Sequence, residues 1–457
     1  MLLPPLFEDR MRTLLGEQYA AFVAGYDQPL RRGLRVNTAR ITTDAFCALF
    51  PHELEPSPFA KDSFYLDAPH KAGSDPLHHA GTYYMQEPSA ASAVTVLDPQ
   101  PGERVLDLCA APGGKSTQIA AKLGDTGLLW SNEYVASRAR ILQQNLERWG
   151  VRNQVVSNRD TATLCDRLTD YFDAVLVDAP CSGEGMFRKE PQALTEWSMD
   201  NVNLCAARQL EILDNAARAV RPGGRLVYST CTFAPEENEG ALFRFLTEHP
   251  DFSLTPIDVA WGCPGFSAEQ VRRLCPEVDD RYDLTACRRI LPQHGGEGHF
   301  IALLYRAEDA YGSRPSPYPY PAKDPNAAAA AELYRDCFTD EPQGVFVTFG
   351  DQVRLLPSDL PDCRGLATAG VAVATVCKNR LEPCHSIFAA TGAEACRRRL
   401  EFSPDDPMLT AFLRGEEIPC ADQKGWTAVC LGGVTVGFGK AGGGKLKNRY
   451  PKGLRLL

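Results

Sequence analysis

The sequence predicts an α/β protein with a Rossmann-like, doubly wound core, an N-terminal α+β extension and small C-terminal α+β modules. Three observations predict this class. Apolar, strand-like runs alternate with helical stretches across residues 94–306, which is the pattern of a mostly parallel sheet covered on both faces. A proline-rich stretch follows, with five prolines between Tyr311 and Pro325. Beyond it, short β-like runs are separated by Gly and Pro.

Four segments follow from these changes of pattern. The N-terminal extension is expected to mix helices and loops, with helical spacing over residues 6–22 and a short strand at 34–38. The linker is expected to be an extended spacer, because proline at this density does not form a core. The expected boundaries are 1–90 for the extension, 91–307 for the core domain, 308–331 for the Pro/Ala-rich linker and 332–457 for the C-terminal modules.

The elements of the core are expected from their periodicity. Helical spacing of apolar residues marks 116–123, 135–150 and 203–221, and Gly150 and Pro222–Gly224 are expected to end helices. The strands expected are 104–109, 127–133, 153–157, 172–178, 224–230 and 299–306. In the C-terminal region the β-like runs are 344–350, 371–376, 426–433 and 434–440.

Composition excludes several classes of protein. The chain has 457 residues, of which 44% are hydrophobic and 23% charged, as in an ordinary globular protein. No apolar run approaches the roughly 20 residues of a membrane helix, and the acidic and basic residues from Glu8 onward are unlike a secretory signal. The sixteen cysteines form no CxxC pair, so we expect reduced thiols and no metal site. The expected location is the cytoplasm.

The first motif with chemical meaning is LDLCAAPGGKS, Leu106 to Ser116. A strand is expected to end at Leu108 and a helix to begin near Ser116, with a tight turn between them. Such a turn lets the backbone approach a ligand and directs helix N–H groups toward it. The phosphate-binding loop GxxxxGK[ST] is disfavoured, because Cys109 stands where its first glycine should be.

Three acids follow at the ends of expected strands. Glu133 comes twenty residues after Gly113, and in nucleotide-binding doubly wound folds an acid at that distance accepts hydrogen bonds from ribose hydroxyls. Asp160 follows the third strand and is expected to face the base of the same ligand. Asp178 ends the apolar run AVLVD, at the sheet edge where open α/β sheets place their sites.

Two cysteines are expected at the same edge of the sheet. Cys181 closely follows Asp178, and Cys231 stands at the end of the next strand in YSTCTF. A single cysteine there is most simply a buried core residue. Two of them beside a carboxylate and a nucleotide-type turn favour chemistry.

These motifs together resemble the Fmu/Sun-like family of RNA 5-methylcytosine methyltransferases. The resemblance rests on LDLCAAPGGKS, on DAPCSGEGMFRK at 178–189 and on STCTF at 229–233. RVNT (35–38) and YYMQEPSA (83–90) are similar to that family's N-terminal region. The basic end, KAGGGKLKNRYPKGLR, resembles that of the RsmF branch, which acts on small-subunit ribosomal RNA, and suggests a PUA-like RNA-binding module.

The resemblance implies S-adenosylmethionine as the methyl donor, Cys231 as the nucleophile and Cys181 as the helper in product release. It also implies RNA as the partner, 16S ribosomal RNA or the small ribosomal subunit, and neither DNA nor a membrane. The extension 1–90 is then expected to bind the RNA substrate. Carried over position by position, the donor-binding residues are Cys109, Ala110, Ala111, Pro112, Gly113, Gly114, Lys115, Glu133, Asp160 and Asp178.

The residues suit this chemistry. Carbon-5 of cytosine becomes enamine-like only after a thiolate has added to carbon-6, and the adduct must later lose the carbon-5 proton and the enzyme sulfur. Cys231 supplies the thiolate, and Asp178 is placed to assist at ring nitrogen-3. A free thiol is only a few per cent ionised at neutral pH, so a cation is expected nearby, for which Lys115 and Lys189 are candidates.

Two other functions stay open at this stage. A DNA cytosine methyltransferase typically places its nucleophile in a Pro-Cys pair, here Pro180–Cys181, so the two cysteines would exchange roles. A non-catalytic RNA-binding ribosome assembly factor would keep the fold without needing either cysteine. The net charge is −10, yet the stretch 440–457 holds six Lys and Arg and no acid, which fits either an RNA-binding surface or a solvated tail.

Overall fold

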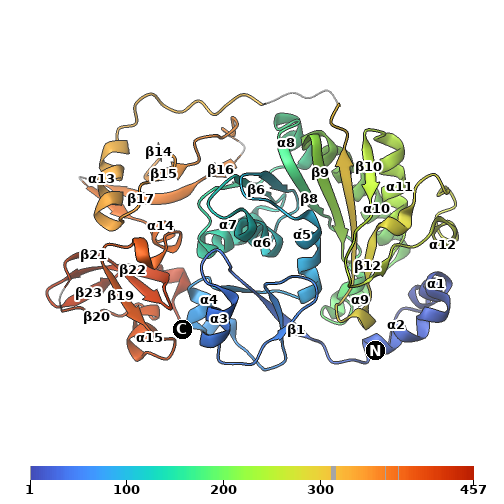
Figure 1. The fold of residues 1–457 in the computed structure, drawn as a ribbon, viewed down its shortest axis with the longest axis horizontal. Coiled ribbons are helices and arrows are strands. Elements are labelled where there is room, and N and C mark those ends of the chain that lie inside the picture. Colours follow the sequence, from blue (N-terminus) through green and yellow to red (C-terminus); the bar gives the residue numbers. More distant parts are fainter. Residues whose placement is uncertain (1, 310–314, 366, 379, 422, 457) are drawn as a thin grey trace.

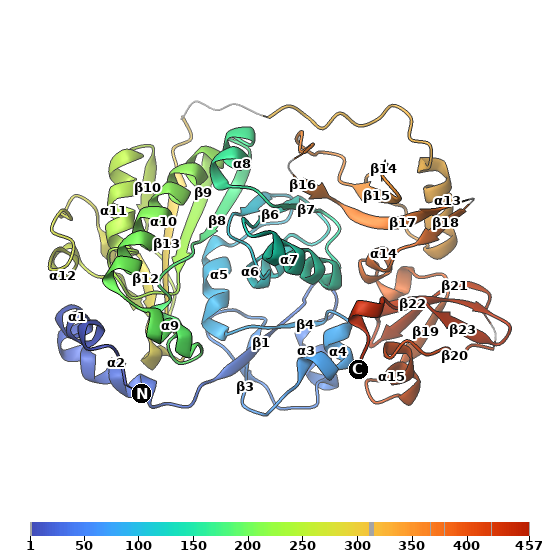
Figure 2. The same ribbon diagram turned by 180° about the vertical axis from the view of Figure 1, so that it is seen from behind.

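The computed structural model describes residues 2–309, 315–365, 367–378, 380–421 and 423–456. The α/β core lies between the N-terminal extension and the C-terminal modules (Figure 1). In both views the C-terminus lies beside α3 (Thr43–Leu49) and α4 (Pro76–His79) of the extension (Figure 1 and Figure 2). The end of the chain therefore packs against the middle of the N-terminal extension.

The core is one sheet of ten strands in the order β11-β12-β13-β9-β8-β5-β6-β7-β16, with β10 paired to β13. The central strands from β7 to β9 run parallel, and β13 is antiparallel to β9. Because the chain first runs outward from β5 and then returns to β5's other side with β8, the topological switch point lies between β5 and β8. The strands are β5 (Arg104–Asp107), β6 (Leu128–Asn132), β7 (Gln154–Ser157), β8 (Phe172–Asp178), β9 (Val220–Thr230), β10 (Phe252–Thr255), β11 (Cys263–Pro264), β12 (Arg288–Ile290) and β13 (His299–Arg306).

Helices cover both faces of this sheet, as the alternating pattern predicts. Neighbouring strand residues point to opposite faces: Leu106 and Leu226 belong to one apolar cluster, and Val105 and Val227 to the other. Pro222–Gly224, expected to end a helix, lies within β9, because α10 already ends at Ala219. The helices are α5 (Ser92–Leu97), α6 (Gly114–Leu123) and α7 (Ala136–Trp149) on one face, and α8 (Thr161–Arg167), α10 (Met199–Ala219) and α11 (Glu239–Glu248) on the other, with α9 (Pro191–Glu196) and α12 (Ala268–Arg272) beside the sheet.

The N-terminal extension contains more strand than its sequence pattern suggests. Its sheet has the order β2-β3-β1-β4, formed by Glu55–Pro56, Ser63–Leu66, Arg32–Val36 and Tyr83–Met85. The helical stretch expected at 6–22 is split into α1 (Pro5–Leu15) and α2 (Tyr19–Tyr26) by a short 3-10 turn.

The C-terminal region forms two small sheets. The first has the order β14-β15-β17-β18, and the second β19-β21-β22-β23-β20. The expected β-like runs are confirmed as strands, whereas the alanine run after the prolines begins helix α13 (Ala327–Cys337). The bounds are β14 (Val345–Phe349), β15 (Gln352–Leu356), β16 (Ala367–Ala369), β17 (Val371–Cys377), β18 (Arg380–Pro383), α14 (His385–Ala389), β19 (Arg399–Phe402), α15 (Pro407–Leu413), β20 (Ile418–Pro419), β21 (Gly425–Leu431), β22 (Val434–Gly442) and β23 (Lys445–Asn448).

Two contacts join these modules to the rest of the molecule. Strand β16 pairs antiparallel with β7, so the C-terminal region supplies an edge strand of the core sheet. A single apolar cluster also contains Leu34 and Phe46 of the extension together with Phe412 and Val436 of the last module. Within the described residues, no helix is long and apolar enough to span a membrane.

Candidate functional site

The turn after β5 lies at the carboxyl edge of the sheet and is held there by neighbouring strands. Leu108 N–H donates to the Leu176 carbonyl at 2.9 Å and Ala110 N–H to that of Asn132 at 2.8 Å. Gly113 has a φ of 113° and precedes α6, a conformation that favours glycine. The turn therefore presents backbone and the start of α6 at the switch point.

Arg35 of the motif RVNT anchors the extension to this turn. Its guanidinium is fully buried and donates to the Gly114 carbonyl at 2.9 Å, to Thr117 Oγ1 at 2.6 Å and to Gln86 Oε1 at 3.0 Å. The sequence identified RVNT as a motif but not its role. The extension thereby fixes the position of the first turn of α6.

Glu133 is brought to the same turn. Its Oε1 accepts from the Val135 N–H at 2.8 Å, and its Oε2 lies 3.4 Å from Arg138 Nη1. Arg138 also donates to the Ala111 carbonyl at 2.8 Å. The expected ribose acid thus lies beside the glycine turn and is nearly buried.

Asp160 reaches the same edge, but its side chain is exposed and caps a helix. Its Oδ1 accepts from the Thr163 N–H at 2.8 Å, and hydrogen bonding there lowers the pKa of Asp160. Asn132 connects this segment to the turn by donating to the carbonyls of Leu108 and Arg159, at 3.3 and 3.0 Å. The edge order β5, β6, β7 therefore brings the turn, Glu133 and Asp160 together.

Asp107 is a residue that the sequence reasoning did not select. It is fully buried, its Oδ2 accepts from Ser116 Oγ at 2.6 Å, and its Oδ1 has no hydrogen-bond partner among the described residues. Burial above all raises the pKa of Asp107 to about 7. The available signal was its place within LDLC, an acid at a strand end like Asp178.

Lys115 and Asp178 form an ion pair across the switch point. Lys115 Nζ lies 2.7 Å from Asp178 Oδ2. Burial opposes the charge of Lys115, but the negative charges of Asp178, Asp107 and Cys231 outweigh it and raise the pKa of Lys115. The ammonium group of Lys115 therefore stays charged at the switch point.

The two cysteines are neighbours, as their strand-end positions predict. Their sulfur atoms are 3.2 Å apart. The hydrogen bond to Cys231, followed by burial, raises the pKa of Cys181 well above its usual value. Cys181 is therefore a thiol that holds its proton firmly, and either sulfur can donate the hydrogen bond between them.

A buried network supports the cysteine loops, and the sequence reasoning missed it. Ser182 and Thr232, the residues after the two cysteines, are joined by a 2.9 Å hydrogen bond. Glu237 accepts from Ser182 N–H at 2.9 Å and from Gln209 Nε2 at 2.8 Å. Burial chiefly raises the pKa of Glu237 to about 7. The network fixes both loops against β9.

The charges at this edge suit a cationic ligand. Asp107, Asp178 and Glu133 all add negative potential at Cys109 in the turn, where they raise the thiol pKa after burial, the main cause. A positively charged ligand such as a sulfonium is favoured by this potential. In the described part of the chain, no group of three or more His, Cys, Asp or Glu residues is arranged to hold a metal ion.

Comparison with protein families covers most of the chain. The model for 16S rRNA methyltransferase RsmB/F matches residues 94–305. The model for the N-terminal domain of 16S rRNA methyltransferase RsmF matches 3–88, and that for the methyltransferase RsmF PUA domain matches 399–456. The three matches follow the core, the extension and the last C-terminal module.

Individual relatives agree with this assignment. The chain is 33% identical to the ribosomal RNA small subunit methyltransferase F of Klebsiella pneumoniae, over 99% of this chain and 96% of that protein. The Vibrio cholerae protein of the same name is 30% identical over 99% and 97%. A methyltransferase homologue from Pyrococcus horikoshii of known structure is 31% identical, with a TM-score of 0.58 over 66% of this chain and 94% of its own. The chain therefore belongs to the ribosomal RNA small subunit methyltransferase F family.

Proposed function

We propose that this protein transfers a methyl group from S-adenosylmethionine to carbon-5 of a cytosine in 16S ribosomal RNA, with Cys231 as the nucleophile. The relatives' names supply the substrate. The observation that supports the chemistry is the pair of sulfur atoms 3.2 Å apart, at the sheet edge where Lys115 pairs with Asp178. Neither an RNA-binding assembly factor nor a structural core requires two adjacent thiols next to a buried ammonium.

The donor is assigned to the glycine turn. Residues 109–115 would approach it through backbone, Glu133 would accept from its ribose hydroxyls, and Asp160 would face the adenine. When bound, the donor supplies an electrophilic methyl group on a positive sulfonium. The carboxylates of Asp107 and Asp178 favour that positive charge at the switch point.

Cys231 would open the reaction by adding its sulfur to carbon-6 of the cytosine. Lys115 would favour the thiolate by its charge, and Asp178, when it carries a proton, would donate a hydrogen bond to ring nitrogen-3. The electron pair displaced from the carbon-5–carbon-6 bond makes carbon-5 nucleophilic. Methylation then leaves carbon-5 with both a methyl group and its original proton.

Cys181 would act at the end of the reaction. Because its thiol keeps its proton, it can donate to the Cys231 sulfur as that sulfur leaves carbon-6. This assignment reverses the one expected for a DNA cytosine methyltransferase, in which the cysteine of the Pro-Cys pair attacks.

Substitution of each cysteine separates these roles. Cys231→Ala should be inactive and should run free of RNA on a denaturing gel, because no bond to RNA forms. Cys181→Ala should accumulate a donor-dependent, denaturant-resistant complex with methylated RNA, and the double variant should resemble Cys231→Ala. Trapping by Cys231→Ala instead would assign the DNA-enzyme pattern, and full turnover by both variants would reject the catalytic proposal.

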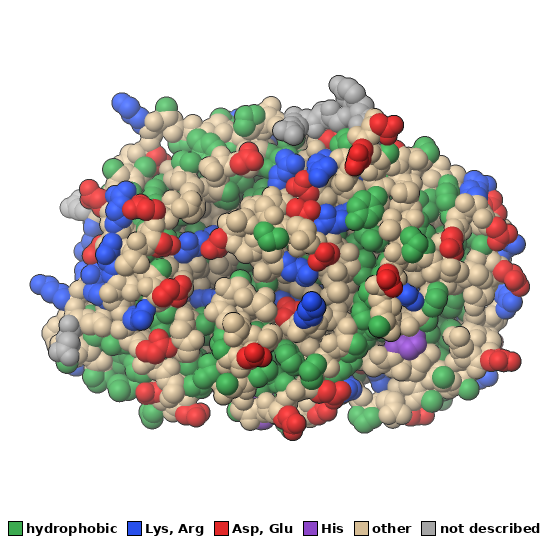
Figure 3. Space-filling model, viewed as in Figure 1, with side chains coloured by type: hydrophobic (Ala, Val, Ile, Leu, Met, Phe, Trp, Pro, Cys, Tyr) green, Lys and Arg blue, Asp and Glu red, His purple; other side chains and the backbone are tan. Residues whose placement is uncertain are grey.

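The last module is assigned to RNA phosphates. Its exposed basic side chains gather at the end of the molecule formed by β21, β22 and β23 (Figure 3). Lys440 and Lys447 are direct neighbours across β22 and β23, and Lys445 is exposed on the same hairpin. Electrostatic attraction of this kind is independent of RNA sequence.

Point substitution is the suitable test, because deleting 332–457 would uncover the apolar cluster shared with the extension. Lys445→Gln with Lys447→Gln should weaken RNA binding and reduce the slope of log K against log salt by about 0.7 for each phosphate that the protein no longer neutralises. Donor affinity should be unchanged. An unaltered slope would make this end a solvated surface.

A further inference from the structure

The carbon-5 proton needs an acceptor that the two cysteines do not provide. Cys181 keeps its proton, and Cys231 is bonded to the ring when the carbon-5 proton must leave. Lys115 is charged and paired with Asp178. A further basic group is therefore required within reach of the nucleophile.

Strand β13 places His299 beside Cys231. Phe300 of β13 pairs with Thr230 of β9. His299 precedes Phe300 and Cys231 follows Thr230, so both residues lie at the same end of this antiparallel pair. Gly185 contacts both segments. Its N–H donates to the Cys231 carbonyl at 2.8 Å, and a Cβ at Gly185 would lie 2.9 Å from the Gly298 carbonyl. The pairing itself ends at Phe300 and Thr230, and His299 and Cys231 are the residues next to that last pair.

The face of the sheet also agrees. Phe300 and Tyr228 belong to one apolar cluster, and Ile301 and Val227 to the opposite one. By alternation His299 lies on the second face. That face carries α6 and therefore Lys115.

The tautomer of His299 follows from its hydrogen bonds. Ser89 Oγ donates its single proton to Glu87 Oε2 at 2.5 Å, and His299 Nδ1 lies 2.9 Å from the same Oγ. Nδ1 must then carry a proton and donate to Ser89, which leaves Nε2 with a free lone pair. Both supporting residues belong to YYMQEPSA, the second motif of the extension.

The charges around the imidazole keep it neutral. The pKa of His299 is well below its usual value. Burial is the main cause, and the positive charges of Lys115 on α6 and Lys189 after β8 add to it. Glu87 opposes them from 3.9 Å away. The ring is thus neutral and able to accept a proton throughout the neutral range.

We propose that Nε2 of His299 is the general base that removes the carbon-5 proton after methyl transfer. This rests on the proposed function. The carbon-5–hydrogen bond breaks and its proton goes to Nε2, while its electron pair forms the carbon-5–carbon-6 double bond. The carbon-6–sulfur bond breaks in turn, and the Cys231 sulfur takes that pair as a thiolate next to the Cys181 thiol.

The test follows the carbon-5 hydrogen directly. RNA tritiated at carbon-5 of its cytosines releases tritium to water only when that bond breaks. In a single turnover, His299→Gln should still transfer a labelled methyl group to RNA and should accumulate a donor-dependent covalent complex. Its rate of tritium release should fall at least about 100-fold, the usual contribution of a general base.

Two variants act as matched controls. His249→Gln changes another histidine, which lies at the end of α11 and is hydrogen-bonded to Asp214, and should leave tritium release unchanged. Ser89→Ala keeps the imidazole but removes the group that fixes its tautomer, and should slow release about tenfold. Thermal unfolding and donor binding of each variant establish that the fold is retained.

Several results would overturn the proposal. Tritium release at the wild-type rate by His299→Gln or Ser89→Ala would remove His299 from proton transfer. Loss of methyl transfer itself in His299→Gln, with donor binding intact, would assign the residue to an earlier step. If wild-type enzyme formed no carbon-6 adduct and released no tritium, the proposed function would fail instead, and the parallel Cys231→Ala sample distinguishes that case.

Discussion

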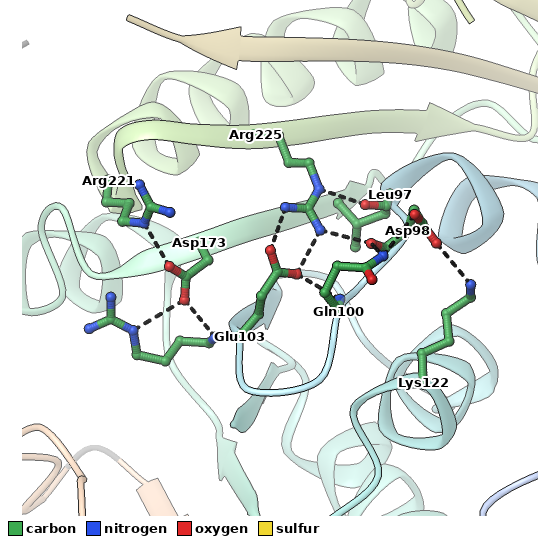
Figure 4. Close-up of polar contacts among 9 residues, drawn as sticks. Leu97, Asp98, Gln100, Glu103, Lys122, Asp173, Arg221 and Arg225 are labelled. Atoms are coloured by element: carbon green, nitrogen blue, oxygen red, sulfur yellow. Dashed lines mark hydrogen bonds and ion pairs between the residues drawn. The ribbon is translucent and has the colours of Figure 1, made fainter. Parts of the chain in front are cut away.

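The two ends of the core sheet differ in how their acidic side chains are paired. At the amino end, Asp173 accepts hydrogen bonds from Arg221 at 2.6 Å and from Arg104 at 3.2 Å. Arg225 donates two hydrogen bonds of 2.7 Å to the Glu103 carboxylate (Figure 4). At the carboxyl end, Asp107 is buried with one oxygen unpartnered among the described residues. The same strands thus carry paired acids at one end and, next to the Lys115–Asp178 pair, a buried acid with an unpartnered oxygen at the other.

The difference separates stability from chemistry. Although burial opposes ionisation, the arginines lower the pKa of Asp173, so its charge stabilises the fold. Burial instead raises the pKa of Asp107 and of Glu237 to about 7, so their ionisation costs stability at neutral pH. Both acids lie at the edge of the sheet for which donor binding and cysteine chemistry are proposed.

The largest effect is expected from removing Lys115. Lys115→Gln should lower the single-turnover methylation rate about 100- to 1,000-fold, because Asp178 is left unpaired and the Cys231 thiolate loses its ammonium neighbour. Alkylation of Cys231 by iodoacetamide at pH 7 should slow in parallel. Arg221→Gln is the control at the other end, since it also takes a partner from a carboxylate, and it should keep the wild-type rate.

A smaller effect is expected from removing Arg225, and it should be on stability and not on activity. Arg225→Gln should lower the free energy of unfolding by about 2–3 kcal/mol, because a mostly buried carboxylate, Glu103, loses a bidentate partner. The guanidinium also donates to the carbonyls of Leu97 and Asp98. Urea unfolding measures the loss, and kcat should not change. A variant that lost activity without losing stability would contradict the division between the two ends.

Most of the core could be predicted from sequence because its signal is local. The runs around β5, β8 and β9 are apolar and short, and the helices between them have clear three-and-four spacing, so the alternation indicates a parallel sheet. Strand β16 had no such signal: Ala367–Ala369 is three residues long, and its partner β7 is about 200 residues earlier in the chain. Pairing at that separation depends on tertiary contacts.

The site was predictable only as far as motifs mark it. Cys181 and Cys231 follow separate strands, and the rule that parallel strands end at one edge was enough to bring them together. The contacts of Arg35 and His299 could not be predicted from the sequence, because each residue bonds to a partner far away in the chain. The partner is the Gly114 carbonyl for Arg35 and Ser89 for His299. A buried polar residue shows its role in the sequence only when its partner is nearby.

The last comparison is a pair of pH dependences with opposite signs. The folded-state pKa of Asp107, about 7, is above its unfolded value, so this residue's contribution is fully favourable below about pH 4 and is lost as pH rises through 7. Asp107→Asn should reduce the fall in the free energy of unfolding with pH by up to about 1.4 kcal/mol per pH unit, measured by urea unfolding between pH 5 and 8.

Asp173 has a lowered pKa, so its contribution to the free energy of unfolding is present above about pH 4 and is lost on acidification. Asp173→Asn should therefore flatten only the acid limb. Matching signs for the two variants would show that both ends of the sheet are electrostatically alike.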